Sequence, residues 1–175
     1  MSCVVGVIDD GKIYMGADGY ATTGEGERRP IVANKLFFNK DYLIGFTGSV
    51  RTGRILTSDY FNPPAKIEEM PDAIREHLYE KGCVLTSEEH GQIHGANFLI
   101  GFQGKIYEIL IDFQMNETRG DCNSIGAGSP FAFGSLYTTR LAKNITPKGR
   151  IMIALNAASC YTSTCGPPFV YESIE

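Results

Sequence analysis

The sequence predicts an α+β fold of four layers (αββα), in which two antiparallel sheets pack face to face between two layers of helices. The first two predicted strands, at residues 3–8 and 12–17, are apolar on both of their faces. An antiparallel strand with one face in water alternates apolar and polar residues instead. Both faces of this sheet are therefore expected to be covered, one by a partner sheet and the other by helices.

The elements at the start of the chain form two predicted hairpins. The first two strands are joined by Asp10-Gly11, a dipeptide typical of tight hairpin turns. Residues 19–33 are polar and rich in glycine, which predicts a loop. Strands at 35–39 and 42–47 then follow around a short turn.

Two helices are predicted after each run of strands. The first helix covers 48–60 and stops before a pair of prolines. The second covers 71–81, where Pro71 suits a first turn and Gly82 suits an end. The remaining predicted elements are strands at 96–103 and 105–113, a short strand near Ser124, helices at 130–143 and 147–161, and a last strand at 169–174.

Length and charge limit the classes of function. The 175 residues suffice for one domain, residues 1–175, with a hydrophobic core, and no repeat or linker divides them. The net charge is -4 and no long basic stretch is present, which argues against a nucleic-acid partner. No apolar run is long enough for a membrane span, and no leader is recognisable, so we expect a cytoplasmic protein.

The cysteines and histidines predict no cofactor or metal site. Five cysteines are scattered without a CxxC pair, which is typical of reduced thiols rather than a zinc site. His90 and His94 in HGQIH lack a third and a fourth ligand, so this segment is interpreted as a loop.

The amino terminus is the first candidate for chemistry. Removal of Met1 is favoured because Ser2 is small, and it would leave an α-amine and a hydroxyl on one residue. The hydroxyl is a weak nucleophile that needs a base. An α-amine, with a pKa of about 7.7–8.0, can accept the hydroxyl proton directly or through one water. The alternative is that Met-Ser is simply a chain start with a polar strand cap.

Three further residues are candidates for the same site. The hairpin register sets Asp18 opposite Cys3 rather than Ser2, so Asp18 is expected to hold a cation, and Lys35 is the candidate. A lysine near the amine favours the neutral amine and the ionised hydroxyl. Gly45 lies within an apolar strand, where its N–H could stabilise an oxyanion. A strand-end salt bridge and close sheet packing are the structural alternatives.

Four segments together resemble the proteasome β-type peptidases of the N-terminal-nucleophile hydrolases, nearest in size to the bacterial HslV type. These are VVGVIDDGKIYMGADGYAT, NKLFF, LIGFTG and SIGAGSPFAFGSL, in family order and spacing. The resemblance implies the αββα fold, a homo-oligomeric ring, peptide or unfolded-protein substrates and an ATP-dependent unfoldase. It puts the nucleophile on Ser2, where the family usually has threonine. Asp18 and Lys35 match its acidic and basic partners, and Gly45 its oxyanion glycine.

The chain departs from the family at two places. The family commonly has a serine within the Gly-rich turn, whereas this chain has Ala127, and Ser129 is the displaced substitute. Near the C-terminus Thr162 stands in place of an aspartate, and Cys165 in place of a serine. These losses keep two alternatives open: an inactive ring or scaffold subunit, and a small-molecule amidase on the same fold.

A rival nucleophile and a side-chain pocket complete the predictions. Cys3 would need both preceding residues removed, and strand parity turns it to the face opposite Ser2. By position, the family's pocket falls on four residues that suggest a preference for a bulky nonpolar side chain: Ala21, Ala33, Phe37 and Thr47.

Overall fold

One four-stranded sheet carries both ends of the chain. The computed structural model describes residues 2–22, 28–30, 34–57, 61–83, 85–86, 93–94, 96–142 and 144–175. The strands of this sheet stand in the order β12 (Cys122–Ile125), β1 (Val4–Asp9), β2 (Lys12–Ala17) and β13 (Val170–Ile174). All neighbours are antiparallel, and β1 pairs with β2 around the predicted turn, with Val4 opposite Ala17.

The second sheet has five antiparallel strands. Their order is β11 (Met115–Glu117), β10 (Lys105–Ile109), β9 (Asn97–Phe102), β6 (Tyr42–Thr47) and β5 (Leu36–Asn39). Strand β6 is buried along its whole length. It is therefore an interior strand covered on both faces, as its apolar sequence YLIGFT predicts.

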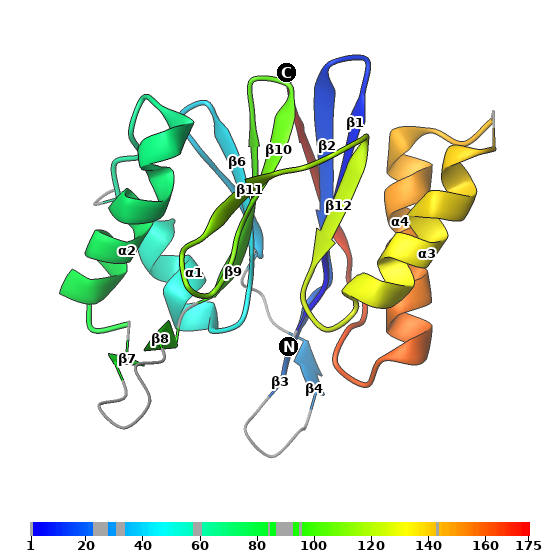
Figure 1. Cartoon of the computed structure of the whole chain (residues 1–175). Coiled ribbons are helices and arrows are strands. Elements are labelled where there is room, and N and C mark those ends of the chain that lie inside the picture. The colour runs from blue at the N-terminus through cyan, green and yellow to red at the C-terminus, as the bar shows by residue number, and fades with distance from the viewer. Residues whose placement is uncertain are drawn as a thin grey trace.

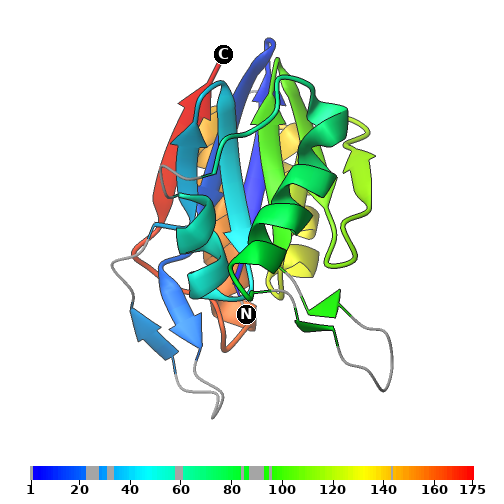
Figure 2. The same ribbon diagram turned by 90° about the vertical axis from the view of Figure 1, so that its left-hand side faces the viewer.

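Helices cover the two outer faces (Figures 1 and 2). The five-stranded sheet is covered by α1 (Val50–Leu56) and α2 (Met70–Glu80), which follows the 3₁₀ helix η1 (Ile67–Glu69). The four-stranded sheet is covered by α3 (Ser129–Arg140) and α4 (Pro147–Tyr161). Figure 1 shows the resulting succession of helices, sheet, sheet and helices from left to right.

Three separate hydrophobic clusters fill the three interfaces between these layers. Val4, Met15 and Leu43 belong to the cluster between the sheets. The alternate residues of β1, such as Val5 and Val7, pack against α3 and α4 instead. The third cluster joins the outer face of β6 and β9 to α1 and α2. A strand that is apolar on both faces thus contributes to two cores, which confirms the predicted fold class.

Several predicted boundaries are wrong for identifiable reasons. The expected loop 19–33 contains β3 (Tyr20–Thr22) and β4 (Arg28–Pro30), which pair as a short hairpin. The helix expected from residue 48 begins at 50, because Ser49 is still extended, and it ends at 56 with Thr57 as its C-cap.

The strand predicted over 105–113 ends at 109. A turn follows in which the N–H of Phe113 donates to the carbonyl of Leu110 at 2.9 Å, and Phe113 has a φ of 64°. The chain then enters β11, which the sequence did not reveal. A second short pair, β7 (Leu85–Thr86) with β8 (Ile93–His94), places His94 in a strand rather than in the expected loop.

In the parts of the chain that the structure describes, no helix has the length and apolar character needed to cross a membrane. Within the same ranges no group of three His, Cys, Asp or Glu side chains is placed to hold a metal ion.

Candidate active site

Ser2 is held in place at the head of β1 between the two sheets. Its side chain is buried, and its carbonyl accepts a hydrogen bond from the N–H of Gly128 at 3.3 Å. Gly126 has a φ of 94° and packs so closely on the Ser2 carbonyl that a Cβ there would collide with it. Met1 lies outside the described residues.

Asp18 and Lys35 form a buried ion pair beside this strand. Asp18 stands opposite Cys3, as the hairpin register predicts: the Asp18 N–H donates to the Cys3 carbonyl at 3.1 Å. The carboxylate oxygen Oδ1 accepts from Lys35 Nζ at 2.6 Å and from the backbone N–H of Cys3 at 2.9 Å. A single carboxylate oxygen thus joins the lysine to the residue that follows Ser2.

Tyr20 completes the environment of this ion pair. Its N–H donates to Asp18 Oδ2 at 3.1 Å, and its carbonyl accepts from Lys35 Nζ at 2.5 Å. The side chains of Lys35 and Asp18 are 1% and 0% exposed. Charges this deeply buried persist only when they are paired and hydrogen-bonded. An ammonium has three donors, and the contacts described here use two of them.

The strand pairing of Gly45 argues against the oxyanion role that the sequence predicts for its N–H. Gly45 lies opposite Leu36 on β5 and opposite Leu99 on β9. The next residue, Phe46, donates its N–H to the carbonyl of Lys35 on the β5 side. Because hydrogen-bonding directions alternate along an antiparallel strand, the N–H of Gly45 points toward β9, inside the sheet.

Close packing explains why residue 45 is glycine. A Cβ at this position would lie 2.6 Å from Val4 Cγ1 and 2.9 Å from Leu36 Cδ2. The glycine therefore lets the two sheets approach each other. This was the structural alternative to a catalytic role.

Gly48 is a second glycine near this site that sequence reasoning did not single out. It follows β6, is exposed, and has a φ of 110°, which residues with a side chain rarely adopt. The preceding residue, Thr47, has its Cγ2 only 2.9 Å from the position that a Cβ on Gly126 would take, beside the Ser2 carbonyl. Gly48 thus directly follows a residue that packs on the turn holding the Ser2 carbonyl. The signal in the sequence was the Gly-Ser pair directly after the strand.

Comparisons with known proteins identify the fold. No protein-family model and no curated protein matches the chain. Solved structures do match: BPH of Thiobacillus denitrificans in complex with epoxomicin has a TM-score of 0.81 at 23% identity, covering 99% of this chain and 98% of that chain. Eukaryotic HslV from Trypanosoma brucei has a TM-score of 0.74 at 21% identity, covering 99% of both chains. The chain has an HslV-like fold. This is the proteasome-type αββα architecture that the four sequence segments predicted.

Two hydroxyls of the HslV-like fold that the sequence singled out bond to backbone carbonyls. The Ser129 hydroxyl donates to the carbonyl of Ser124 at 2.7 Å. The Thr162 hydroxyl donates to the carbonyl of Ala158 at 2.8 Å, within the last turn of α4. Both therefore satisfy backbone carbonyls of their own segments. A supporting role of Ser129 at the terminal amine stays a prediction.

Cys3 is poorly suited to be the nucleophile of this HslV-like fold. Its side chain faces α3 and α4, on the side of β1 opposite the inter-sheet core. A hydrogen bond with Cys165, followed by burial, raises the pKa of the Cys3 thiol far above its ordinary value. A thiol rather than a thiolate is a weak nucleophile.

The four residues predicted to form the side-chain pocket do not all lie on the same face of the sheet. Thr47 is buried beside Gly126 and Ser2, and Ala21 is half-buried next to Tyr20. Phe37 faces the other way, because it packs on the α1 and α2 cluster with its ring 6.5 Å from that of Phe46. Ala33 lies outside the described residues.

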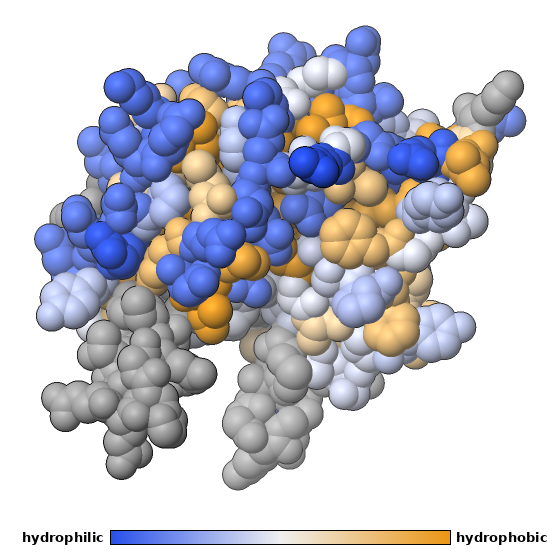
Figure 3. Space-filling view, in the orientation of Figure 1, coloured by the Kyte–Doolittle hydropathy of each residue, from blue (hydrophilic) through white to orange (hydrophobic). Residues whose placement is uncertain are grey.

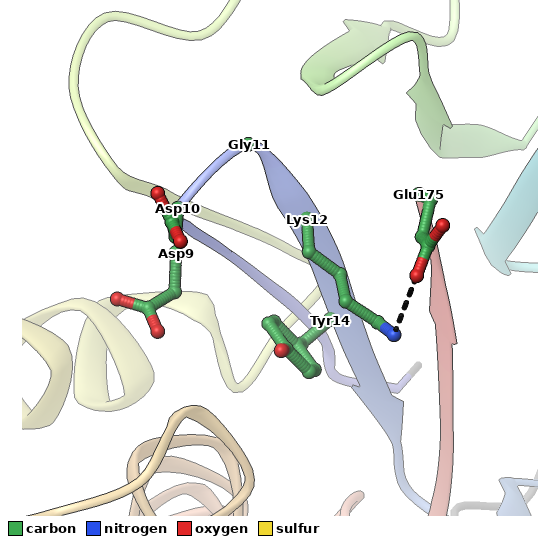
Figure 4. Close-up of a pocket in the computed structure, with 6 residues that line it drawn as sticks. All are labelled: Asp9, Asp10, Gly11, Lys12, Tyr14 and Glu175. Carbon is green, nitrogen blue, oxygen red and sulfur yellow. Dashed lines mark hydrogen bonds and ion pairs between the residues drawn. The ribbon is translucent and has the colours of Figure 1, made fainter.

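The hollow drawn in Figure 4 is separate from the candidate site. It lies at the β1–β2 turn, at the opposite end of these strands from Ser2. Its walls include Asp9 and Asp10, and Lys12 Nζ pairs with Glu175 Oε1 at 3.5 Å across it. The exposed ion pair and the open shape are typical of a solvated hairpin end.

Proposed function

We propose that the chain is a peptidase that cleaves peptide bonds with Ser2 as an N-terminal nucleophile after removal of Met1. The observation that carries this proposal is the Asp18 oxygen shared by Lys35 Nζ and the N–H of Cys3. It fixes a buried positive charge next to the residue that would carry both the hydroxyl and the amine. A strand-end salt bridge without catalytic purpose would more commonly be exposed.

In the proposed reaction the Ser2 α-amine takes the hydroxyl proton while the oxygen attacks the peptide carbonyl. The Lys35 ammonium, oriented by Asp18, stabilises the developing alkoxide and favours the neutral amine. The N–H of Gly48, instead of that of Gly45, stabilises the tetrahedral oxyanion. The amine returns its proton to the leaving group, and water then hydrolyses the acyl-enzyme.

The HslV-like fold supports the coarser parts of the proposal. We infer a cytoplasmic homo-oligomeric ring that takes peptides or unfolded proteins, with an ATP-dependent unfoldase as its partner. The buried Thr47 and the half-buried Ala21 favour a mainly apolar pocket for the substrate side chain.

An inactive ring subunit is the second candidate. It is favoured by Ala127 in the Gly-rich turn and by the hydroxyls of Ser129 and Thr162, both of which are engaged with backbone carbonyls. Under this alternative the buried ion pair holds the hairpin together and has no chemical role.

Variants of Ser2 separate these two candidates. We expect the intact mass of the purified protein to lack Met1, and Ser2→Ala to lower the turnover of short fluorogenic peptides about a thousandfold or more. Ser2→Thr keeps the hydroxyl and is expected to stay active, and Ser163→Ala, an exposed serine, is the matched control. Retained Met1 together with equal turnover in Ser2→Ala would contradict the proposal.

Epoxomicin provides a test that does not depend on turnover. It is bound in the BPH structure of Thiobacillus denitrificans. If the same site exists here, epoxomicin raises the melting temperature of the wild type, because a ligand that binds the folded state stabilises it. An unchanged melting temperature at saturating epoxomicin favours the inactive subunit.

A further inference from the structure

Two buried thiols lie side by side behind the nucleophile. Cys3 comes from the head of β1 and Cys165 from the segment between α4 and β13, and both are 0% exposed. They share the hydrophobic cluster under α3 and α4. A Cβ on Gly128 would lie 2.8 Å from Cys3 Cβ and 3.0 Å from Cys165 Sγ. The glycine therefore leaves the space in which the two side chains meet.

Polar neighbours distinguish this pair from ordinary core cysteines. Ser124 Oγ lies 3.7 Å from Cys3 Sγ, and Thr164 Oγ1 lies 3.9 Å from Cys165 Sγ. The hydrogen bond from Cys3 lowers the pKa of Cys165 to about 7, while it raises the pKa of Cys3. The nearby Asp18 carboxylate opposes ionisation of either thiol. Of the two thiols, Cys165 is therefore the one whose ionisation this contact favours.

We propose that Cys3 and Cys165 are an oxidation site, a dithiol that hydroperoxides convert into an intramolecular disulfide. The Cys165 thiolate attacks one oxygen of the hydroperoxide and the O–O bond breaks, which gives a sulfenic acid and, after protonation, water or an alcohol. The Cys3 sulfur then attacks the Cys165 sulfur, the S–O bond breaks, and the hydroxide takes the Cys3 proton as water. Two thiols are oxidised and one peroxide bond is reduced.

The crosslink has a consequence for the candidate active site, and this second step rests on the proposed function. Cys3 directly follows Ser2, and its N–H is bonded to Asp18. The segment of Cys165 reaches the same place, because the carbonyl of Gly166 accepts from the N–H of Gly19 at 2.9 Å. Drawing the two sulfurs together therefore shifts the backbone on both sides of the ion pair. We expect turnover to fall on oxidation and to return with a reductant.

The disulfide is tested with hydrogen peroxide as the probe. After treatment of the full chain and alkylation of remaining thiols under denaturing conditions, we expect two unalkylated cysteines and a peptide that links Cys3 to Cys165. Cys165→Ser is expected to abolish the crosslink, whereas Cys160→Ser, which removes an exposed thiol, leaves it unchanged.

The outcomes separate the oxidation site from the peptidase proposal. Full alkylation of both cysteines after peroxide, a link to another cysteine, or sulfinic acid on Cys165 without a link would each overturn the dithiol. The peptide map of the wild type decides this even if Cys165→Ser fails to fold. A clear crosslink in a protein without turnover would leave the dithiol in place and count against the peptidase alone.

Discussion

At the scale of single residues, the buried Lys35 ammonium strongly constrains its surroundings. Removing a charge of either sign from this pair would leave its partner buried among apolar residues, with a large desolvation penalty. Backbone groups of Cys3 and Tyr20 reduce this penalty, because they hydrogen-bond to the charged side chains of the pair. The same contacts therefore serve stability and the proposed chemistry.

Lys35→Met should accordingly destabilise the fold. We expect a loss of about 3–5 kcal/mol in the free energy of unfolding, because the Asp18 carboxylate is left without its cation. Urea unfolding measures this change through the midpoint at an unchanged slope. The same variant should lose peptide turnover.

An exposed ion pair gives the matched control. Arg75 and Asp72 on α2 lie 3.0 Å apart, with side chains 50% and 72% exposed. Arg75→Met is expected to change the free energy of unfolding by less than about 1 kcal/mol. Equal effects of the two substitutions on the free energy of unfolding would mean that burial of the Lys35 pair adds no stability beyond that of an exposed pair.

Sequence reasoning located the ion pair but did not single out Gly48, the glycine proposed as the oxyanion donor, for a physical reason. The Asp10-Gly11 turn fixes the hairpin register, and the register alone places Asp18 opposite Cys3. From the sequence alone, Gly45 and Gly48 are equally plausible as the oxyanion donor. They differ in hydrogen-bonding direction and in φ, and both depend on how β6 pairs with its two neighbours.

At the scale of elements, the apolar character of β1, β2 and β6 was sufficient to predict a sheet-on-sheet core. Consecutive apolar residues indicate that a strand is buried on both faces, and this pattern can be read from the strand's own sequence. Strand β11 and the β3–β4 hairpin were missed because short polar strands carry no periodic signal. Their pairing is decided by the neighbouring strand.

The sheet interface itself can be tested at Gly45. Gly45→Ala forces a methyl group against Val4 and Leu36, and such overpacking is expected to cost about 1–3 kcal/mol of unfolding free energy. Gly134→Ala in α3 is the matched control, since no atom lies within 4 Å of its added methyl group. This control is expected to gain about 0.5–1 kcal/mol, because alanine is the better helix residue. Denaturant titration of both variants measures the difference, and a neutral Gly45→Ala would remove the packing explanation.

At the scale of the whole molecule, the helical layer of α3 and α4 differs from that of α2. Figure 3 shows apolar side chains gathered over α3 and α4. The exposed large side chains on or next to these two helices are Phe131, Phe133, Tyr137, Leu141, Ile153 and Tyr161. Extended apolar surface of this kind marks protein contacts. It supports the ring assembly proposed for the HslV-like fold.

The assembly predicts a solution mass that is a multiple of 19.2 kDa. Light scattering on the eluting protein measures this mass. Leu141→Glu places a charge on the apolar layer, where Leu141 is 70% exposed, and it is expected to lower the mass because burying an unpaired carboxylate opposes association. Tyr79→Glu, at a position on α2 that is 68% exposed, should leave the mass unchanged. A wild type of 19.2 kDa at every concentration would contradict the ring, and an equal response of both variants would place the contact elsewhere.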